Sequence, residues 1–249
     1  MSCKLGWTAK GVVLTVSQVV SLSFFRFDTA AGRLWAFAMM GLARRPLSRL
    51  DGIGFWKLCG SGSGEGFDLR PNTGVYAILA TWPDARTARA QVEGSALYRR
   101  YRARAAECWT VYMTTASVRG AWSGRTPFET GPTPAAGGPV AALTRATLRP
   151  RIMTRFWGRV PRISEVIGRD PDVIFKIGIG DVPYLRQVTF SIWPDAARMA
   201  AFARTGPHAE AIRAVRENDW FREELYARFA LLGDSGTWGG RSPLAKEDT

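Results

Sequence analysis

The residue best suited to metal chemistry is His208, the only histidine in this 249-residue chain. A single histidine excludes zinc sites built on several histidines and the two-histidine iron triad. Axial ligation of haem iron is a role that one imidazole can perform alone. Thr205-Gly206-Pro207 predicts a helix start with His208 in the first turn, where the helix dipole favours the neutral, metal-binding imidazole. Spacing alone fits a half-buried histidine with one hydrogen bond better than a ligand, so both interpretations stay open.

Cys59 is the alternative iron ligand, since a cysteine thiolate also binds haem. The wider cysteine-haem loop pattern is missing, which favours a small buried side chain instead. The glycine-rich stretch 60–66 imitates a dinucleotide fingerprint, but residues 67–71 lack the helix start that a pyrophosphate needs. We expect a hairpin loop there that acts as a lid. The three cysteines include no CxxC pair, so neither a zinc site nor a disulfide framework is expected.

Arginine accounts for much of a net charge of +13, and the pI is near 10.5. Such a field attracts polyanions, anionic lipid surfaces or acidic proteins. Arg204 and Arg213 flank His208 and are the candidates for contact with haem propionates or with the distal side of a haem. The other arginines predict a solvated basic face. The acidic residues form no paired motif, which argues against a glycosidase-like or carboxylate-metal site.

An internal repeat defines the elements that must position these residues. Trp82 and Trp193 lie 111 residues apart within matching Trp-Pro-Asp-Ala strings, and Trp109 matches Trp220 at the same spacing. Further on, the string that starts at Trp122 matches the one that starts at Trp238. At the spacing of 111, His208 aligns with Leu97, so one copy has a leucine where the other has a potential ligand.

Each copy predicts the order strand, helix, strand, strand, helix, strand. In the first copy the elements span 18–27, 30–45, 54–59, 75–81, 85–106 (broken at Gly94) and 109–118. In the second they span 140–147, 151–167, 173–179, 186–192, 196–216 (broken at Gly206-Pro207) and 220–232. Leu34, Phe37, Ala38 and Gly41 show the helical spacing that supports the first helix.

This order is the ferredoxin-like βαββαβ unit, and the fold class is α+β. We expect two fused ferredoxin-like repeats that bury their open sheet faces together as an α+β barrel, with two separate domains side by side as the alternative. The boundaries are an N-terminal extension (1–17), repeat 1 (18–128), a Pro- and Gly-rich linker (129–139) and repeat 2 (140–249), which carries His208. Ser, Thr and Gln interrupt the apolar run 12–27, so it predicts neither a membrane span nor a signal peptide.

Six long strings carry a resemblance to a known family. They are VVSLSFFRF (19–27), RLWAFAMMGLARRPL (33–47), GIGFWKLCGSGSGEGF (52–67), LATWPDARTA (79–88), YRRYRARAAECWTV (98–111) and HAEAIRAVRENDWFREELYARF (208–229). In these strings the chain resembles the spheroidene monooxygenase family, the acyclic carotenoid 2-ketolases, from about residue 18 to the end. That family is in turn similar to dimeric α+β barrel haem proteins.

The resemblance implies an enzyme of photosynthetic bacteria that introduces an oxo group at C-2 of acyclic carotenoids such as spheroidene. It implies haem b as cofactor, with His208 as the iron ligand, and reduced ferredoxin as the electron donor. We expect a cytoplasmic protein whose basic surface could dock an acidic ferredoxin, or make peripheral contact with the anionic inner photosynthetic membrane where carotenoids dissolve. A carotenoid needs an apolar tunnel, and the candidate lining residues are Trp35, Phe37, Phe55, Trp56, Phe156 and Trp157.

Three other functions remain open from the residues alone. Tandem βαββαβ units with many aromatic residues and a basic pI also describe RNA-recognition modules, although no RNP1-like run is present and no nucleic-acid partner is expected. A barrel that binds haem without oxygenase activity is the second. The third is a cofactor-free oxygenase in which His208 is a base.

Overall fold

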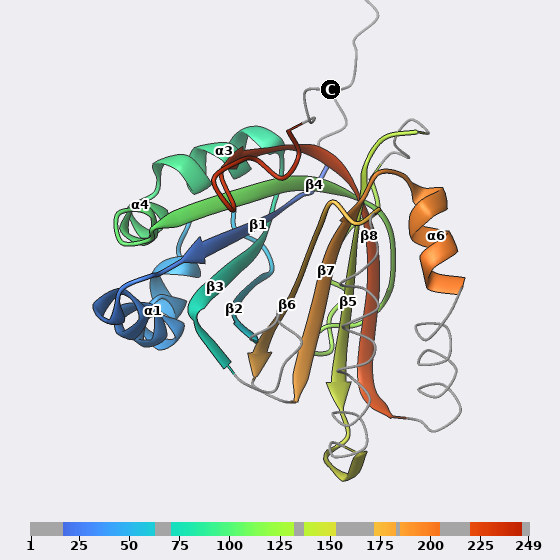
Figure 1. The fold of residues 1–249 in the computed structure, drawn as a ribbon, viewed down its shortest axis with the longest axis horizontal. Coiled ribbons are helices and arrows are strands. Elements are labelled where there is room, and N and C mark those ends of the chain that lie inside the picture. The colour runs from blue at the N-terminus through green and yellow to red at the C-terminus, as the bar shows by residue number, and fades with distance from the viewer. Residues whose placement is uncertain are drawn as a thin grey trace, which may run out of the picture.

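The computed structural model describes residues 17–62, 71–131, 137–152, 172–182, 185–204 and 220–245. Eight strands form one closed barrel in the order β1-β3-β2-β6-β7-β5-β8-β4 (Figure 1). The strands are β1 (Val19–Arg26), β2 (Trp56–Gly62), β3 (Pro71–Trp82), β4 (Glu107–Gly120), β5 (Val140–Leu148), β6 (Phe175–Val182), β7 (Arg186–Trp193) and β8 (Phe221–Gly236). The helices are α1 (Ala30–Leu42), α2 (Arg44–Leu47), α3 (Ala85–Gly94), α4 (Ala96–Arg102) and α6 (Ala196–Arg204), with a 3-10 turn at Pro150–Ile152.

The barrel consists of two antiparallel sheets, one from each repeat. Strands β4, β1, β3 and β2 form the first sheet, and β8, β5, β7 and β6 form the second in the equivalent order. Pairing of β4 with β8 and of β2 with β6 closes the barrel. This confirms the expected α+β barrel of ferredoxin-like repeats, with strand ends within about four residues of the predicted ones.

Alternate residues of every strand point into the barrel, because side chains in a strand alternate between its two faces. Phe24, Trp109, Phe175 and Phe190 pack there with ring centroids 4.6–6.3 Å apart. An RNA-recognition module stacks bases on the sheet face that its helices leave open. Here that face of both sheets is buried inside the barrel, which argues against the RNA-binding alternative.

The helices of repeat 1 differ in detail from the predicted ones. Thr29 caps α1 by accepting a hydrogen bond from the Gly32 N–H, and the predicted helix 30–45 is divided at Ala43 into α1 and α2. The predicted break at Gly94 is confirmed, with Ser95 capping α4. Within the described ranges no helix is long and apolar enough to cross a bilayer. Most of the predicted helix 151–167 and the second half of helix 196–216 lie outside the described residues.

Candidate functional site

The helix-facing side of the first sheet is filled with large apolar side chains. Phe25, Leu58, Tyr76 and Ile78 all point to this side and are buried in the same hydrophobic cluster. Two tyrosines of α4 complete the layer, with the rings of Tyr101 and Phe25 4.9 Å apart. Repeat 1 therefore has no space left between its sheet and its helices.

Strand pairing identifies the corresponding positions of the second sheet. Ile78 of β3 pairs with Leu58 of β2 and Ser23 of β1. In the same arrangement, Thr189 of β7 pairs with Gly178 of β6 and Thr144 of β5. By the same correspondence Tyr76 is replaced by Gln187 and Phe25 by Ala146. Four large apolar side chains of repeat 1 thus have small or polar counterparts in repeat 2.

One end of this second face is covered by helix α6. Met199 is buried, and the Phe202 ring lies 5.0 Å from that of Trp193. The Trp193 indole donates a hydrogen bond to Ser191 Oγ at 2.9 Å. The other end carries Thr144, Gln187 and Thr189, which are half-buried. This part of the second sheet therefore carries smaller and more polar side chains than the same part of the first sheet.

The predicted haem-binding residues lie at the end of helix α6, which covers one end of this face, or follow it closely in the sequence, but only Arg204 is among the described residues. Arg204 is exposed at the end of α6, and its Nε donates to the Ala200 carbonyl oxygen at 3.0 Å. His208 and Arg213 lie outside the described residues. The repeat 1 counterpart of His208 is Leu97, which is 4% exposed and packs in the layer between helices and sheet.

Cys59 points into the barrel interior and is fully buried. Burial raises the pKa of its thiol, and the nearby Asp181 raises it further. A neutral thiol inside a packed barrel is a poor iron ligand, because the ligand form is the thiolate. Throughout the described ranges, no three His, Cys, Asp or Glu side chains are grouped so that they could hold a metal ion.

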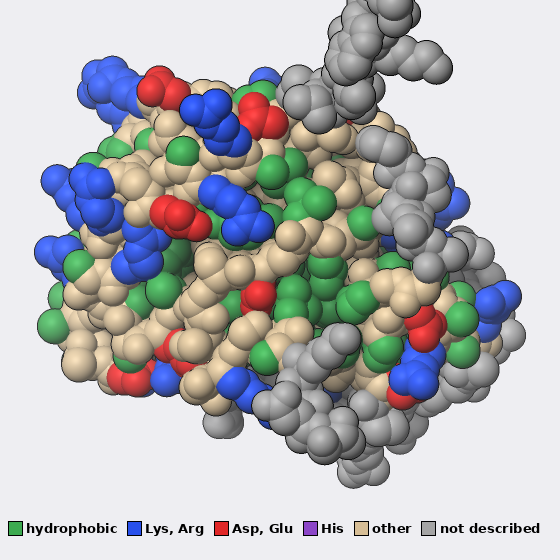
Figure 2. Space-filling view, turned by 90° about the horizontal axis from the view of Figure 1, so that it is seen from above, with side chains coloured by type: hydrophobic (Ala, Val, Ile, Leu, Met, Phe, Trp, Pro, Cys, Tyr) green, Lys and Arg blue, Asp and Glu red, His purple; other side chains and the backbone are tan. Residues whose placement is uncertain are grey.

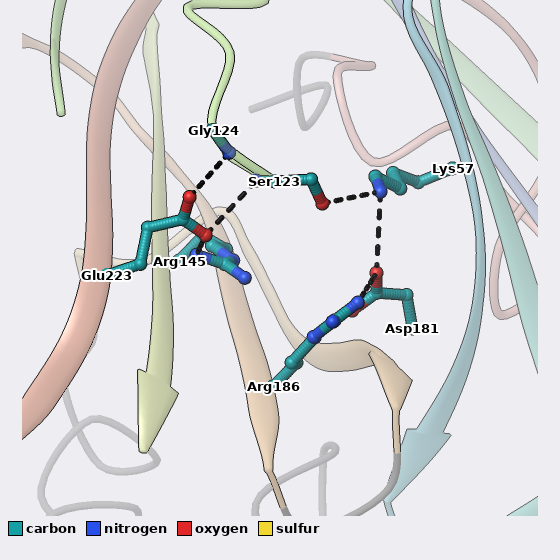
Figure 3. A network of polar contacts seen from close by, with 7 residues as sticks. All are labelled: Lys57, Ser123, Gly124, Arg145, Asp181, Arg186 and Glu223. Carbon is teal, nitrogen blue, oxygen red and sulfur yellow. Dashed lines mark hydrogen bonds and ion pairs between the residues drawn. The ribbon is translucent and has the colours of Figure 1, made fainter. Parts of the chain in front are cut away.

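A second polar feature occupies one end of the barrel interior (Figure 3). Glu223 of β8 accepts hydrogen bonds from the backbone N–H groups of Ser123 and Gly124 at 3.1 and 2.6 Å, and from the Arg145 guanidinium. Asp181 of β6 forms ion pairs with Lys57 at 3.6 Å and Arg186 at 3.2 Å. Three cations and two carboxylates from five strands therefore meet where an apolar core would be expected.

The energetics of this charged end depend on Arg145, whose side chain is only 1% exposed. Burial lowers the pKa of Arg145, whereas Glu223 raises it. Burial raises the pKa of Glu223, but the N–H groups of Gly124 and Ser123 together with Arg145 outweigh it and hold the pKa below its ordinary value. Among the described residues, four buried polar atoms have no hydrogen-bond partner here: Arg145 Nε, Trp122 Nε1, Thr147 Oγ1 and Asp181 Oδ1.

The opposite end of the barrel is built on the same plan with an aromatic residue in place of the cation. There Glu107 accepts from the Gly240 N–H at 2.7 Å, as Glu223 accepts from Gly124. Trp238 packs on Phe24 with centroids 5.9 Å apart, whereas Trp122 has the Arg145 guanidinium 5.8 Å from its ring centroid. Repeat 2 therefore places a buried cation where repeat 1 places a phenylalanine.

Sequence reasoning missed this charged end, because its members come from distant strands. The available signal was Arg145 itself, because it follows Ala141 and Leu143 at every second residue of β5, and side chains at these positions point into the barrel. The predicted tunnel residues are dispersed. Phe55 lies at the charged end, with its ring 5.6 Å from that of Trp122, while Trp35 and Trp56 pack in the helix layer of repeat 1. Phe37 is 67% exposed, so its assignment to a tunnel was wrong; Phe156 and Trp157 lie outside the described residues.

Comparison with known proteins gives close sequence relatives and distant structural ones. No family model matches the chain. It is 50% identical over 232 residues to spheroidene monooxygenase of Rhodobacter capsulatus, with 92% of this chain and 96% of the relative covered. It is 49% identical to the enzyme of that name from Cereibacter sphaeroides (92% and 71% covered) and 37% identical to that from Rubrivivax gelatinosus (85% and 81%).

Among solved structures, an aldoxime dehydratase superposes with a TM-score of 0.58 at 11% identity, covering 88% of this chain and 82% of the other. A second aldoxime dehydratase, crystallised with butyraldoxime, gives a TM-score of 0.57 at 10% identity (88% and 80% covered). At such low identity, these two likenesses concern the barrel fold alone.

Proposed function

The chain belongs to the spheroidene monooxygenase family, and we propose that it is a haem-dependent ketolase that introduces an oxo group at C-2 of an acyclic carotenoid. Carotenoid monooxygenase activity follows from the family. The cofactor, the position of oxygenation and reduced ferredoxin as electron donor belong to the proposal. The observation that carries it is the small and polar helix-facing side of the second sheet, in the repeat that contains His208.

Residues of repeat 2 fit a haem at this face. Leu97 of repeat 1 points into the layer between helices and sheet, and its counterpart is His208. We therefore propose the His208 imidazole as the iron ligand, in the neutral form that binds metals. Gly178 and Ala146 stand where repeat 1 has Leu58 and Phe25, and such small side chains suit a flat macrocycle against the sheet. Arg213, and Arg204 at the end of α6, are the proposed partners of the propionates.

When bound, haem supplies the activation of molecular oxygen. The chain supplies positioning and the exclusion of water. Thr144 and Thr189 are cross-strand neighbours in the middle of the face. Their hydroxyl groups can donate hydrogen bonds to an oxygen atom held against the sheet, while the packed barrel behind them keeps water out. The basic surface suits an acidic ferredoxin and an anionic membrane.

Absorption spectroscopy of purified protein tests the proposal. We expect a Soret band that disappears in His208→Ala and persists in Leu97→Ala, the matched substitution in repeat 1. The variant Gly178→Leu/Thr189→Ile rebuilds the face of the first sheet, and we expect it to exclude haem although His208 is intact. A wild-type protein without a Soret band after addition of haemin would refute the haem proposal, and carotenoid turnover without iron would then favour a cofactor-free oxygenase.

A further inference from the structure

Helix α1 exposes a continuous apolar stripe to solvent. Leu34, Phe37 and Leu42 are 71%, 67% and 69% exposed, and Ala38 and Gly41 between them are exposed as well. The spacing of three or four residues places all five on one side of the helix. These three account for most of the large hydrophobic side chains exposed in the described part of the chain.

The stripe is not needed to attach α1 to the molecule. Gly32, Ala36 and Met39 form the buried side of the helix, and Trp35 packs between Phe27 and Tyr101 at centroid distances of 5.9 and 5.1 Å. A surface helix normally carries polar residues on the side opposite its buried face. Here that side is apolar, which points to a partner outside the chain.

Arginines border the stripe, and no acidic residue lies within its segment. Residues 29–50 contain Arg33, Arg44, Arg45 and Arg49 but neither Asp nor Glu, and residues 94–106 contain four further arginines and no acidic residue. The two segments are adjacent, because the Arg104 guanidinium lies 4.7 Å from the centroid of the Trp35 ring. Lys and Arg side chains gather at the left of Figure 2, the side on which Figure 1 shows α1 and α4.

Arginines of α4 and of the residues just after it shape a shallow depression on this side. Its lining combines the cations Arg99, Arg100 and Arg104 with the small apolar residues Ala96 and Ala103. A phosphate group can be held by arginines in this way. The exposed apolar residues of α1 and the arginines that could contact phosphate groups therefore lie on the same side of the molecule.

We infer that the α1 stripe and the flanking arginines dock the protein on an anionic phospholipid bilayer. Amphipathic helices bind membranes by inserting apolar side chains at the level of the acyl boundary while basic residues contact the headgroups. A second copy of the chain is the less suitable partner, because two such faces would bring their arginines together. The inference rests on the proposed function in one respect, because a carotenoid substrate dissolves in the bilayer and docking would hold the protein at that bilayer.

Sedimentation of the full chain with vesicles tests this inference. We expect binding to phosphatidylcholine vesicles that contain phosphatidylglycerol, and weaker binding at high salt. Leu34→Glu/Phe37→Glu should lower partitioning by about tenfold or more at any salt concentration. Arg99→Gln/Arg100→Gln should lower it by about fivefold per arginine at low salt and have little effect at high salt. Leu232→Glu, at an exposed leucine of β8, is the matched control and should bind as wild type does.

Three outcomes would overturn the inference. They are wild-type protein that stays in solution, a Leu34→Glu/Phe37→Glu variant that binds as well as wild type, and a wild-type dimer that this variant dissociates. The Soret band and the urea midpoint of each variant are recorded on the same preparations. Loss of vesicle binding with the haem spectrum intact separates docking from catalysis, and carotenoid presented in detergent micelles should still be converted.

Discussion

The two equivalent glutamates, Glu107 and Glu223, allow the cost of a buried cation to be measured within one molecule. Each accepts a backbone N–H from the turn that follows the last strand of the other repeat. They differ in the arginine with which they pair. Arg145 is 1% exposed, whereas Arg26 is 40% exposed and also pairs with Asp28 at 3.2 Å.

Replacement of each glutamate by glutamine should therefore have unequal effects. Glu223→Gln keeps a hydrogen-bond acceptor for the turn but takes away the carboxylate that is hydrogen-bonded to the buried Arg145, which leaves Asp181 as the negative charge that acts on it. Removal of one partner of a buried pair costs about 3–5 kcal/mol, and we expect about 3 kcal/mol because Glu223 is itself 23% exposed. Glu107→Gln leaves a solvated arginine that keeps Asp28, so we expect about 1 kcal/mol.

Urea unfolding of the two single variants measures this difference, provided that the slope of the transition is unchanged. The decisive control is Arg145→Phe, which gives the charged end the residue that Phe24 supplies at the other end. In that background Glu223→Gln should cost about 1 kcal/mol or less, because no buried cation remains. Equal losses in Glu107→Gln and Glu223→Gln, or an undiminished loss in the Arg145→Phe background, would refute the reasoning.

Three other perturbations test the same structure. The pKa values of Glu107 and Glu223 in the folded protein lie below the ordinary value. The contribution of their ionised form to the stability of the fold is therefore present above an unfolded pKa of about 4.3 and is lost as the pH falls through the lower folded value. The melting temperature should accordingly fall less steeply below about pH 4 in Glu223→Gln than in wild type. Gly120 has φ +92° and a Cβ there would lie 2.1 Å from the Glu224 carbonyl oxygen, so Gly120→Ala should cost about 2–3 kcal/mol in urea unfolding, whereas Gly94→Ala meets no atom within 4 Å and should not destabilise. Cys59 is fully buried with a raised thiol pKa, so mass spectrometry should find it unalkylated by iodoacetamide in native protein and alkylated in urea; rapid native labelling would contradict its placement.

The sequence predicted the barrel because its signals are local and repeated. Alternation of apolar residues located all eight strands, and the duplicated Trp-Pro-Asp-Ala strings indicated that the second four strands repeat the first. Helical spacing also identified α1 correctly. It could not say which side of that helix faces the core, and for this reason Phe37 was assigned to a tunnel although it is 67% exposed.

The charged end could not be predicted, because its contacts join residues that are far apart in the chain. Arg145 and Glu223 are separated by 78 residues, and neither belongs to a recognisable motif. Their meeting depends on the register of β5 against β8, which places Thr147 beside Glu223 and Arg145 one inward position deeper. Register follows from the pattern of the whole sheet and not from any single string.

The two repeats differ at two places, behind the sheet and inside the barrel, and at both places repeat 2 has the smaller or more polar side chains. Behind its sheet, Gly178 and Thr189 stand where repeat 1 has Leu58 and Ile78, and inside the barrel Arg145 stands where repeat 1 has Phe24. Either change made in repeat 1 would remove contacts from a filled core, at a cost of several kcal/mol for each large side chain lost. Repeat 1 thus retains the packing that stabilises the barrel, and this stability allows repeat 2 to carry a buried charge inside the barrel and a less apolar face behind its sheet.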